Sequence, residues 1–371
     1  MKKIYLVGGA VRSKLLNLPV NDRDFVVIGS SAKEMLALGF LRVGHSFPVF
    51  IHPVTKEEYA LARRERKSGS GYAGFEVDCD KSITLEEDLH RRDITINAIA
   101  MDLEDNDKIY DFNNGIDDLK NRVIRHVSCH FIEDPLRVIR ICRFVALLHD
   151  FNFTIADETD AIMRKLIHGG ELLSLSPNRL LLELKKVFEN TKYPDVFFQT
   201  MKKYKVLDQV LTAFAAMPPE DYSYLRRGCR VHKCKDALLL GLSLISCRMK
   251  STEVDKLVDE LPLSRKQRYF CTFFNRWHGY LGSLTDMEVC KILDLIKSVK
   301  HPYFDTLSEV ISDIDDALNT RSQVTSLKEM YLLLKSAPYA KLIRGSENFN
   351  LQKAKLQKQL ILEYIEECRR R

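Results

Sequence analysis

The chain has 371 residues, of which 45% are hydrophobic and 29% are charged, and its net charge is +6. This apolar content excludes an intrinsically disordered protein, and the length is typical of two to four domains. Because the sequence has no run of 18 apolar residues and no signal-peptide core, we expect a cytoplasmic protein without a membrane span.

The first 133 residues are predicted to form a small mixed sheet with short helices. Residues 3–7 are an apolar strand that ends at Gly8-Gly9, and a helix is expected at 10–16. Residues 66–75 are rich in glycine and serine, so we expect a flexible loop there. Further strands are predicted at 24–28, 47–51, 58–62, 94–101 and 108–111.

Almost every segment after Asp134 has the spacing of an amphipathic helix. Asp134-Pro135 and Ser176-Pro177 each place a capping side chain before a proline, which is a typical helix start. The fold class that follows is α+β, with a small mixed-sheet head and an extended all-helical remainder. The predicted domains are a head at 1–133, a neck at 134–210, a body at 211–300 and a basic tail at 301–371.

The charge of the tail is concentrated at its end. The last 31 residues hold eight basic and four acidic residues, which is +4 of the net +6. This pattern is typical of a segment that binds a polyanion, although a solvated helix face is the alternative.

Asp22 and Asp24 lie on either side of Arg23, directly before the predicted strand residues 25–28. Since alternate residues of a strand point to the same face, both carboxylates are expected to project together, about 7 Å apart along the backbone. Such a pair suits two Mg²⁺ ions, which prefer carboxylate oxygens and share their ligand shell with substrate phosphates. A polar strand end without a metal is the alternative.

Gly8-Gly9 supplies a complementary feature between a strand and a helix. Without side chains, the backbone N–H groups can approach a phosphate closely, and Arg12 lies one turn into the helix. The spacing matches neither the dinucleotide-binding G-x-G-x-x-G pattern nor a Walker loop. Together with a carboxylate-held metal, this turn favours a nucleoside triphosphate as ligand, while a plain strand-to-helix turn is the alternative.

The segment from Leu6 to Arg12, together with Asp22-Arg23-Asp24, resembles the first signature of the DNA polymerase beta-like nucleotidyltransferases. Within that superfamily the chain resembles the bacterial class II tRNA nucleotidyltransferases, the CCA-adding enzymes, in the form without an HD phosphohydrolase domain. Further motifs of that family follow in order at 91–98, 115–120, 133–137 and 176–179.

The resemblance implies roles for the head residues. Asp22 and Asp24 would hold two Mg²⁺ ions and carry the catalysis, in which the primer 3′-hydroxyl attacks an α-phosphate and pyrophosphate leaves. Arg92, with Asp93, would contact the sugar and phosphates of the nucleotide, near Gly9 and Arg12. Glu58 is a candidate third carboxylate, and an ordinary surface glutamate is the alternative. Ser13 replaces the aspartate usual in the family, which leaves the orientation of Arg12 in question.

The resemblance also implies how a base is selected. Asp134 and Arg137 would read the Watson–Crick edge of the incoming CTP or ATP in place of a template. Arg140 and Arg143 follow on the same helix, where a phosphate would satisfy them. In the competing interpretation, Asp134 only caps the helix, Arg137 makes a surface ion pair, and the other two arginines are solvated.

The function implied is sequential addition of C, C and A from CTP and ATP to the tRNA 3′ end, with the body and tail binding the acceptor arm. The intact loop at 66–75 favours complete CCA addition over a partial CC- or A-adding reaction. A bacterial poly(A) polymerase, a D-x-D glycosyltransferase and a non-catalytic RNA-binding relative are the alternatives. We expect neither a membrane nor a stable protein partner, and no zinc site at Cys229–Cys234, which lacks a second ligand pair.

Overall fold

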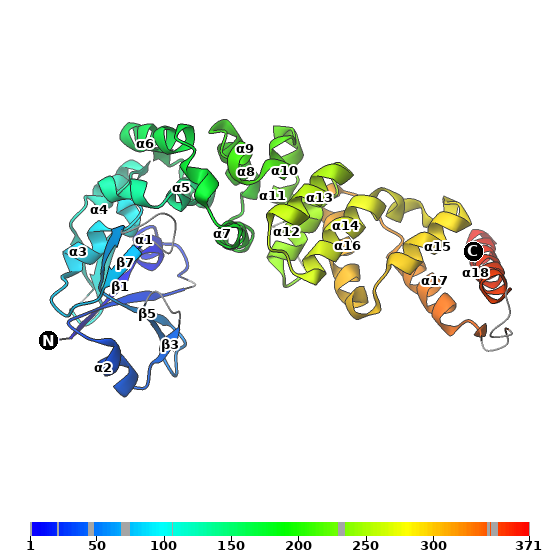
Figure 1. Ribbon diagram of the computed structural model, residues 1–371, viewed down its shortest axis with the longest axis horizontal. Coiled ribbons are helices and arrows are strands. Elements are labelled where there is room, and N and C mark those ends of the chain that lie inside the picture. The colour runs from blue at the N-terminus through cyan, green and yellow to red at the C-terminus, as the bar shows by residue number, and fades with distance from the viewer. Residues whose placement is uncertain are drawn as a thin grey trace. The chain divides into compact units, whose positions relative to one another are not determined.

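The computed structural model describes residues 2–20, 22–43, 48–67, 75–105, 107–228, 234–339, 342 and 348–370. These residues form two compact units (Figure 1). Unit 1 comprises residues 1–179 and 203–210, and unit 2 comprises residues 180–202 and 211–371. The α+β fold class is confirmed, because a mixed sheet near the N-terminus is followed by helices. The division into head, neck, body and tail at the bounds given above stays a prediction.

A seven-stranded sheet forms the centre of unit 1, in the order β3-β4-β5-β2-β1-β8-β9. The only parallel pair in this sheet, as far as the structure describes it, is β2 with β5. Its strands are β1 (Lys3–Val7), β2 (Asp24–Ile28), β3 (Leu41–Val43), β4 (Val49–Ile51), β5 (Glu58–Leu61), β8 (Ile99–Asp102) and β9 (Lys108–Asp111).

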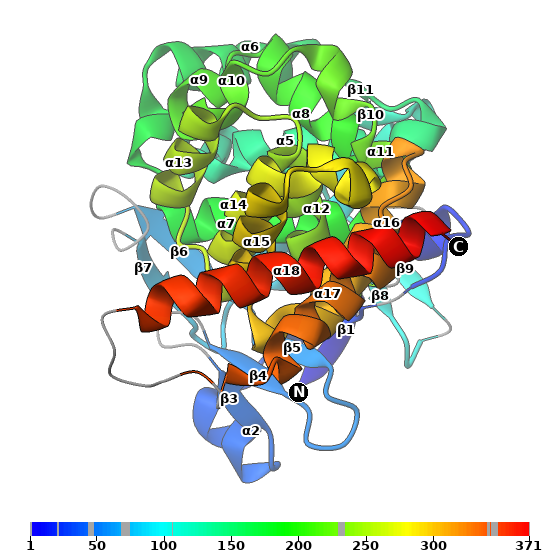
Figure 2. The same ribbon diagram turned by 90° about the vertical axis from the view of Figure 1, so that its right-hand side faces the viewer.

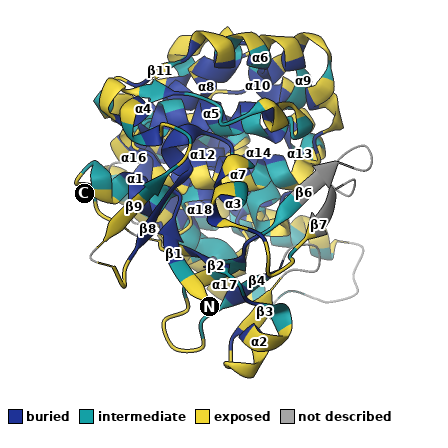
Figure 3. Cartoon of the chain, turned by 90° about the vertical axis from the view of Figure 1, so that its left-hand side faces the viewer, coloured by how far each residue is buried: buried dark blue, intermediate teal, exposed yellow. Residues whose placement is uncertain are grey.

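Alternation along the strands gives the sheet two buried faces. Leu6, Phe25 and Met101 form one core cluster with Val11 of α1 (Gly9–Leu15). On the opposite face, Tyr5, Val7 and Val26 form another cluster with Leu85 and Leu89 of α3 (Leu85–His90). The period of two therefore places a helix on each side of the central strands, which are dark blue in Figure 3.

Two segments differ in detail from the sequence-based expectation. Residues 95–97 form a single 3₁₀ turn, so β8 begins only at Ile99 instead of continuing a strand from residue 94. The predicted loop is flanked by an antiparallel pair, β6 (Arg64–Lys67) and β7 (Phe75–Asp78). Residues 68–74 of that loop lie outside the described residues, so the expectation of flexibility stays a prediction there.

Of the remaining helices of unit 1, α2 lies between β2 and β3, and the others come after β9. Pro135 is the N-cap of α5, and the side chain of Asp134 accepts a hydrogen bond from N of Leu136 (3.1 Å), the first residue of that helix. These helices are α2 (Ala32–Ala37), α4 (Gly115–Asn121), α5 (Leu136–Leu147), α6 (Asp157–His168) and α9 (Leu207–Val210), and α7 (Pro177–Asn190) begins at the end of this unit.

Unit 2 is helical throughout its described residues. At its centre, α12 (Ala237–Ser246) is buried from Leu238 to Ser246 and packs on α11, α14 and α16. Figure 2 shows α18 (Phe349–Arg370) crossing α15 and α17, with Ile361 and Ile365 as its buried residues. The other helices are α8 (Pro194–Lys203), α10 (Thr212–Ala215), α11 (Leu225–Gly228), α13 (Ser251–Glu260), α14 (Arg265–Trp277), α15 (Val289–Ser298), α16 (Phe304–Leu318) and α17 (Val324–Ser336).

None of the helices in the described part of the chain has the length and hydropathy that a membrane span requires.

Candidate active site

A cavity of about 540 Å³ in unit 1 collects most of the residues that the sequence motifs singled out. Six arginines and four carboxylates contribute to its lining, so the charge of its walls favours an anionic ligand. The charged lining residues are Arg63, Arg91, Arg92, Arg137, Arg140, Arg179, Asp24, Glu58, Asp93 and Asp134.

The turn after β1 forms part of the lining. Gly8 has φ = +72°, a left-handed conformation that favours glycine, and Gly9 begins α1. A Cβ atom on Gly8 would lie 3.4 Å from Nη1 of Arg92, so the backbone of this turn and a cavity arginine approach closely. The predicted phosphate-binding elements Gly9 and Arg92 are therefore brought together at this end of the cavity.

Two carboxylates project from neighbouring strands. Asp24 and Glu58 are partners in the parallel pairing of β2 with β5, and both are exposed and line the cavity. Val7, the last residue of β1, lies opposite Asp24. Glu58 is a candidate third carboxylate with an ordinary surface glutamate as the alternative, and its role stays a prediction.

The structure does not place Asp22 beside Asp24 in a strand. The strand β2 begins at Asp24, and Asp22 is an exposed residue that precedes it and does not contribute to the cavity lining. Arg23, between them, makes an ion pair with Glu57 at 2.8 Å. Within the described residues, no three histidine, cysteine or carboxylate side chains are grouped as metal ligands. The role of Asp22 stays a prediction.

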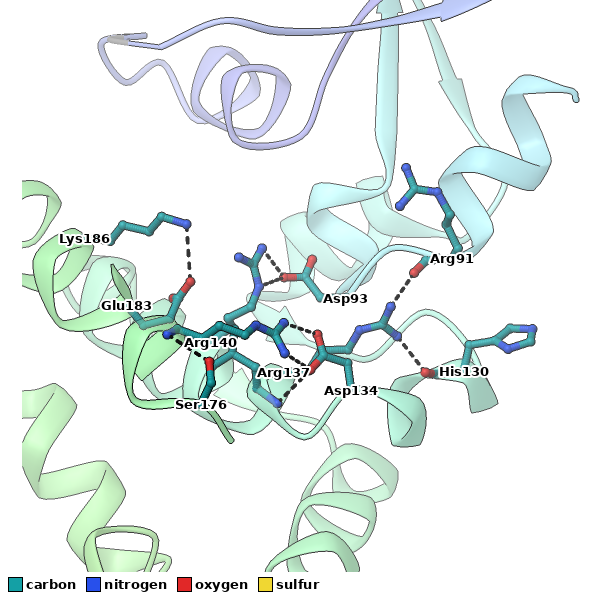
Figure 4. Close-up of polar contacts among 11 residues, drawn as sticks. Arg91, Asp93, His130, Asp134, Arg137, Arg140, Ser176, Glu183 and Lys186 are labelled. Carbon is teal, nitrogen blue, oxygen red and sulfur yellow. Dashed lines mark hydrogen bonds and ion pairs between the residues drawn. The ribbon is translucent and has the colours of Figure 1, made fainter. Parts of the chain in front are cut away.

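The predicted base-reading pair consists of Arg137 on α5 and Asp134, which lies two residues before that helix (Figure 4). Arg179 donates to both carboxylate oxygens of Asp134, with distances of 3.0 and 2.7 Å. Arg137 donates to the carbonyl oxygens of His130 (2.8 Å) and Arg91 (2.7 Å), so these backbone groups hold its guanidinium. Asp134 and Arg137 are thus both fixed at the cavity by partners of their own.

Arg179 is a site residue that sequence reasoning did not select. Its motif, Ser176 to Arg179, was recognised, and Arg179 N donates to Ser176 Oγ at 3.4 Å near the start of α7. The side chains of Asp134 and Arg179 are each 20% exposed, so this ion pair is largely shielded from water. No sequence signal shows that residues 45 positions apart meet.

Asp93 ties the cavity wall to α5. It accepts from Arg140 Nε (2.8 Å) and Nη2 (2.7 Å) and from the backbone N–H of Ile94 (2.9 Å). Burial alone would raise the pKa of Asp93, but the Arg140 guanidinium holds it well below its usual range. Arg140 therefore has an internal partner as well as a place in the cavity lining.

Arg12 and Arg143 are buried, and neither contributes to the cavity lining. Arg12 donates to Asn97 Oδ1, and its guanidinium lies 5.8 Å from the ring centroid of Phe144. Burial, followed by repulsion from Arg143, lowers the pKa of Arg12 to about 10. Asn97 thus orients Arg12 in this chain, which has Ser13 in place of the aspartate usual in the family. A direct contact of Arg12 or Arg143 with the nucleotide stays a prediction.

Asp88 is a further residue that the motifs did not indicate. Its fully buried carboxylate accepts from Arg91 at 2.7 Å and from Arg92 at 3.0 Å, the two residues that follow α3. Burial opposes ionisation, but the two guanidinium groups lower the pKa of Asp88 to about 2. Asp88 therefore positions two arginines that line the cavity, although Asp88 itself does not line it.

Comparison with known proteins places this geometry in a family. Residues 4–125 match the poly A polymerase head domain, and residues 152–217 match the probable RNA and SrmB- binding site of polymerase A. A CCA-adding enzyme from Actinobacillus succinogenes is 53% identical over 316 residues, which are 79% of this chain and 78% of that protein. The chain belongs to the CCA-adding enzymes.

A second relative shows the same family in a longer protein. The multifunctional CCA protein of Pasteurella multocida is 54% identical over 215 residues, which are 58% of this chain and 50% of that protein. The family that the ordered motifs predicted is therefore confirmed, and the chain is a tRNA nucleotidyltransferase. The matched head domain is named after poly(A) polymerases. The choice between CCA addition and polyadenylation therefore rests on the relatives of high identity.

Solved CCA-adding enzymes share the fold of this chain at lower identity. An apo form has a TM-score of 0.67 at 22% identity, covering 99% of this chain and 91% of that one. Complexes of such enzymes with ATP, with CTP and with tRNA have TM-scores of 0.64, 0.59 and 0.58 at 21–22% identity. They cover 98–99% of this chain and 88–90% of those chains.

Proposed function

We propose that the enzyme adds C, C and A in sequence to the 3′ end of tRNA, using CTP and ATP and releasing pyrophosphate. One observation carries this proposal: a single cavity has Asp24 and Glu58 on strands at one wall and Asp134 and Arg137 at another. Carboxylates suited to phosphoryl chemistry and groups suited to reading a base thus line the same space. The complexes of related enzymes with ATP, CTP and tRNA support these substrates.

The donor set suits Mg²⁺, which takes oxygen ligands and is commonly held by one or two carboxylates together with substrate phosphates. Asp22 and Asp24 are the proposed ligands for two ions, and Glu58 beside Asp24 is the proposed third. When bound, the metal supplies neutralisation of phosphate charge and activation of the attacking hydroxyl. The surrounding protein contributes the backbone N–H groups of the Gly8-Gly9 turn and the guanidinium of Arg92 for the phosphates.

Base selection is proposed to depend on the donor and acceptor pattern of Asp134 and Arg137. An ionised carboxylate offers about four acceptor positions, and Leu136 N and Arg179 take three of them at Asp134. The remaining position suits the exocyclic amine of cytosine or adenine. Arg137 donates to the ring nitrogen or carbonyl of the same base edge. Uracil and guanine present the opposite pattern and leave a buried polar group unpaired, which costs about 1–3 kcal/mol.

The decisive test supplies tRNA ending at the discriminator base, Mg²⁺, and CTP, ATP or both, and sizes the products. Three additions that require both nucleotides support the proposal. Long A tails would indicate a poly(A) polymerase, and two C residues alone would indicate a partial enzyme. Absence of any incorporation would favour the non-catalytic relative.

Variants test the carboxylate assignment. Asp24→Ala and Asp22→Ala are expected to abolish incorporation while tRNA binding is retained, because metal ligation and RNA binding use different groups. Asp105→Ala removes an exposed carboxylate whose ion pair with Lys108 is 3.6 Å long, and serves as the matched control. Incorporation that survives in either of the first two variants would show that the corresponding ligand assignment is wrong.

The cytoplasmic location and the lack of a stable protein partner stay predictions. Cell fractionation and the elution volume of the purified chain would test them.

A further inference from the structure

The face of the sheet that lines the candidate active site continues outward to the edge strand β3 (Figure 3). Pairing of five adjacent strands sets a row of side chains across this face. In order from β1 to β3, the row consists of Val7, Asp24, Glu58, Ile51 and Leu41. Since directly paired residues point to the same side of a sheet, all five side chains share this face. The two carboxylates thus have the Gly8-Gly9 turn on one side and an aliphatic pair on the other.

A second row, two residues further along the strands, widens the aliphatic part. Ala60 pairs with Val49, and Val49 pairs with Val43. Val49 and Ala60 also contribute to the lining of the cavity, so the two surfaces are continuous. We call the four side chains of this face on β3 and β4 the aliphatic platform: Leu41, Val43, Val49 and Ile51.

The aliphatic platform is open to solvent. Leu41 and Val43 are 58% and 41% exposed, and the other two side chains are half-buried. On the opposite face of β4, Phe50 is fully buried in a core cluster with Met35 of α2. A solvated sheet face ordinarily carries polar residues, and edge strands are usually protected by charge. Aliphatic side chains that stay exposed beside a catalytic cavity therefore indicate a binding surface.

The chemistry of the proposed reaction determines from which side the attacking hydroxyl arrives. In phosphoryl transfer the attacking and leaving oxygens lie roughly in line, on opposite sides of the phosphorus. The proposed phosphate-binding groups, the Gly8-Gly9 turn and Arg92, lie at the β1 end of the row, so pyrophosphate leaves toward that end. The 3′-hydroxyl then approaches from the other end, where the backbone of Ile51 lies about 5 Å and that of Leu41 about 10 Å from Glu58.

We propose that the aliphatic platform holds the base and ribose of the 3′-terminal nucleotide of the tRNA, whose hydroxyl is extended. The inference rests on the proposed function and adds a subsite to it. Aliphatic side chains make van der Waals contacts with any base and have no hydrogen-bonding group that distinguishes one base from another.

A surface without base preference suits this position. The terminal nucleotide is first the discriminator nucleotide and then each of the two added C residues, so the subsite has to accept different bases in turn. The base of the incoming nucleotide is instead selected by Asp134 and Arg137, at another wall of the cavity.

The test combines a protein variant with a changed tRNA terminus. Leu41→Ala with Val43→Ala truncates the two exposed side chains of the platform. The tRNA ends either in its normal discriminator nucleotide or in an abasic ribonucleotide that keeps the 3′-hydroxyl. The rate of the first C addition is measured in a single turnover, at saturating tRNA and CTP, for all four combinations.

The truncated variant should add C to the normal terminus about tenfold more slowly, because apolar surface equivalent to about two methylene groups loses its contact. The rate penalty of the abasic terminus should be about tenfold smaller in the truncated variant than in the wild type, because both changes remove the same contact. KM for CTP should stay that of the wild type. The loss should be similar for A, G, C and U as discriminator base.

Two further variants serve as controls. Leu36 of α2 and Leu38, the C-cap of that helix, are 50% and 57% exposed, and α2 packs on the opposite face of the sheet through Met35. Leu36→Ala with Leu38→Ala should therefore keep the wild-type rate and the wild-type abasic penalty. Leu41→Met with Val43→Ile retains the apolar surface of the platform and should stay close to the wild type in both measurements.

An abasic penalty that is equal in the wild type and the truncated variant would overturn the inference. That conclusion holds even if the truncated variant melts at a lower temperature, because each penalty is a ratio of rates within one protein. An equal loss of rate in the Leu36/Leu38 control would also overturn it. A wild type that elutes as a dimer and a truncated variant that elutes as a monomer, with equal abasic penalties, would assign the platform to a second copy of the chain instead.

Failure of the proposed function gives a different result. A wild type that adds no nucleotide to the normal terminus refutes the proposed function, and this inference with it. Equal abasic penalties in an enzyme that adds C, C and A refute only the platform.

Discussion

Replacement of Arg179 by glutamine tests whether the geometry of Asp134 sets nucleotide selection. Arg179 makes two charged hydrogen bonds to Asp134, and both side chains are four-fifths buried. A hydrogen bond to a charged group is worth about 1.5–3 kcal/mol. Because the two hydrogen bonds of the Arg179 guanidinium form together, we expect the interaction free energy between Arg179 and Asp134 to be about 2 kcal/mol. That free energy corresponds to a loss of about 30-fold in kcat/KM.

The loss in kcat/KM is expected for CTP and ATP only. Incorporation of C and A depends on the oriented carboxylate of Asp134, whereas slow misincorporation of U does not. The ratio of kcat/KM for CTP to that for UTP should therefore fall by about 30-fold, measured by single-nucleotide extension of tRNA that lacks CCA. Arg179→Lys keeps the charge but not the bidentate fork, so an intermediate loss is expected.

A double-mutant cycle separates this effect from a general loss of stability. In an Asp134→Ala background, Arg179→Gln should have little further effect on selection, because its partner is already absent. Arg164→Gln removes a more exposed ion pair of the same length, with Asp160 at 2.7 Å on α6, and should leave the ratio unchanged. Equal ratios for Arg179→Gln and the wild type, or additive losses in the cycle, would refute the reasoning.

Three other variants give independent checks. Glu58→Gln should raise the Mg²⁺ concentration needed for half-maximal incorporation at least tenfold, and an unchanged Mg²⁺ dependence would show that Glu58 is not a ligand. The pKa of Asp88 is lowered to about 2 in the fold, so its contribution of about 2 kcal/mol is complete above about pH 5 and is lost as the pH falls from about 4 toward 2. Urea unfolding at pH 6 and pH 3 should show that Asp88→Asn has lost this part of the acid sensitivity, and an identical pH dependence would contradict it. Gly115→Ala should lower the free energy of unfolding by at least about 2 kcal/mol, because its Cβ would lie 2.3 Å from the carbonyl oxygen of Thr95, and wild-type stability would contradict this.

Local patterns predicted the elements that present the site. The apolar runs of β1 and β2, the Gly8-Gly9 turn and the helix start at Asp134-Pro135 all depend on neighbouring residues, and each was found within one or two residues. The same reasoning extended a strand through residues 95–97, which form a 3₁₀ turn whose three residues are all buried. When every residue of a segment is buried, the hydrophobic pattern cannot distinguish a strand from a helical turn.

Contacts between distant residues were not predictable. Arg12 was expected at the phosphates, but its orientation depends on Asn97, 85 positions away, and on burial against α5. Likewise, Asp22 and Asp24 satisfy an alternation rule only if both belong to the strand, whereas β2 begins at Asp24. Charge and spacing identify candidate residues, while tertiary packing decides which of them reach the cavity.

The position of β1 in the sheet has a consequence for biosynthesis. Among the strands of this sheet β1 comes first in the sequence, yet it lies between β2 and β8, and its Val7 pairs with Ala100. Until β8 has been translated, one edge of β1 has unpaired backbone groups, and such edges promote aggregation. A nascent chain halted before residue 99 should therefore remain incompletely folded and depend on chaperones, whereas a chain extended past β9 can close the sheet.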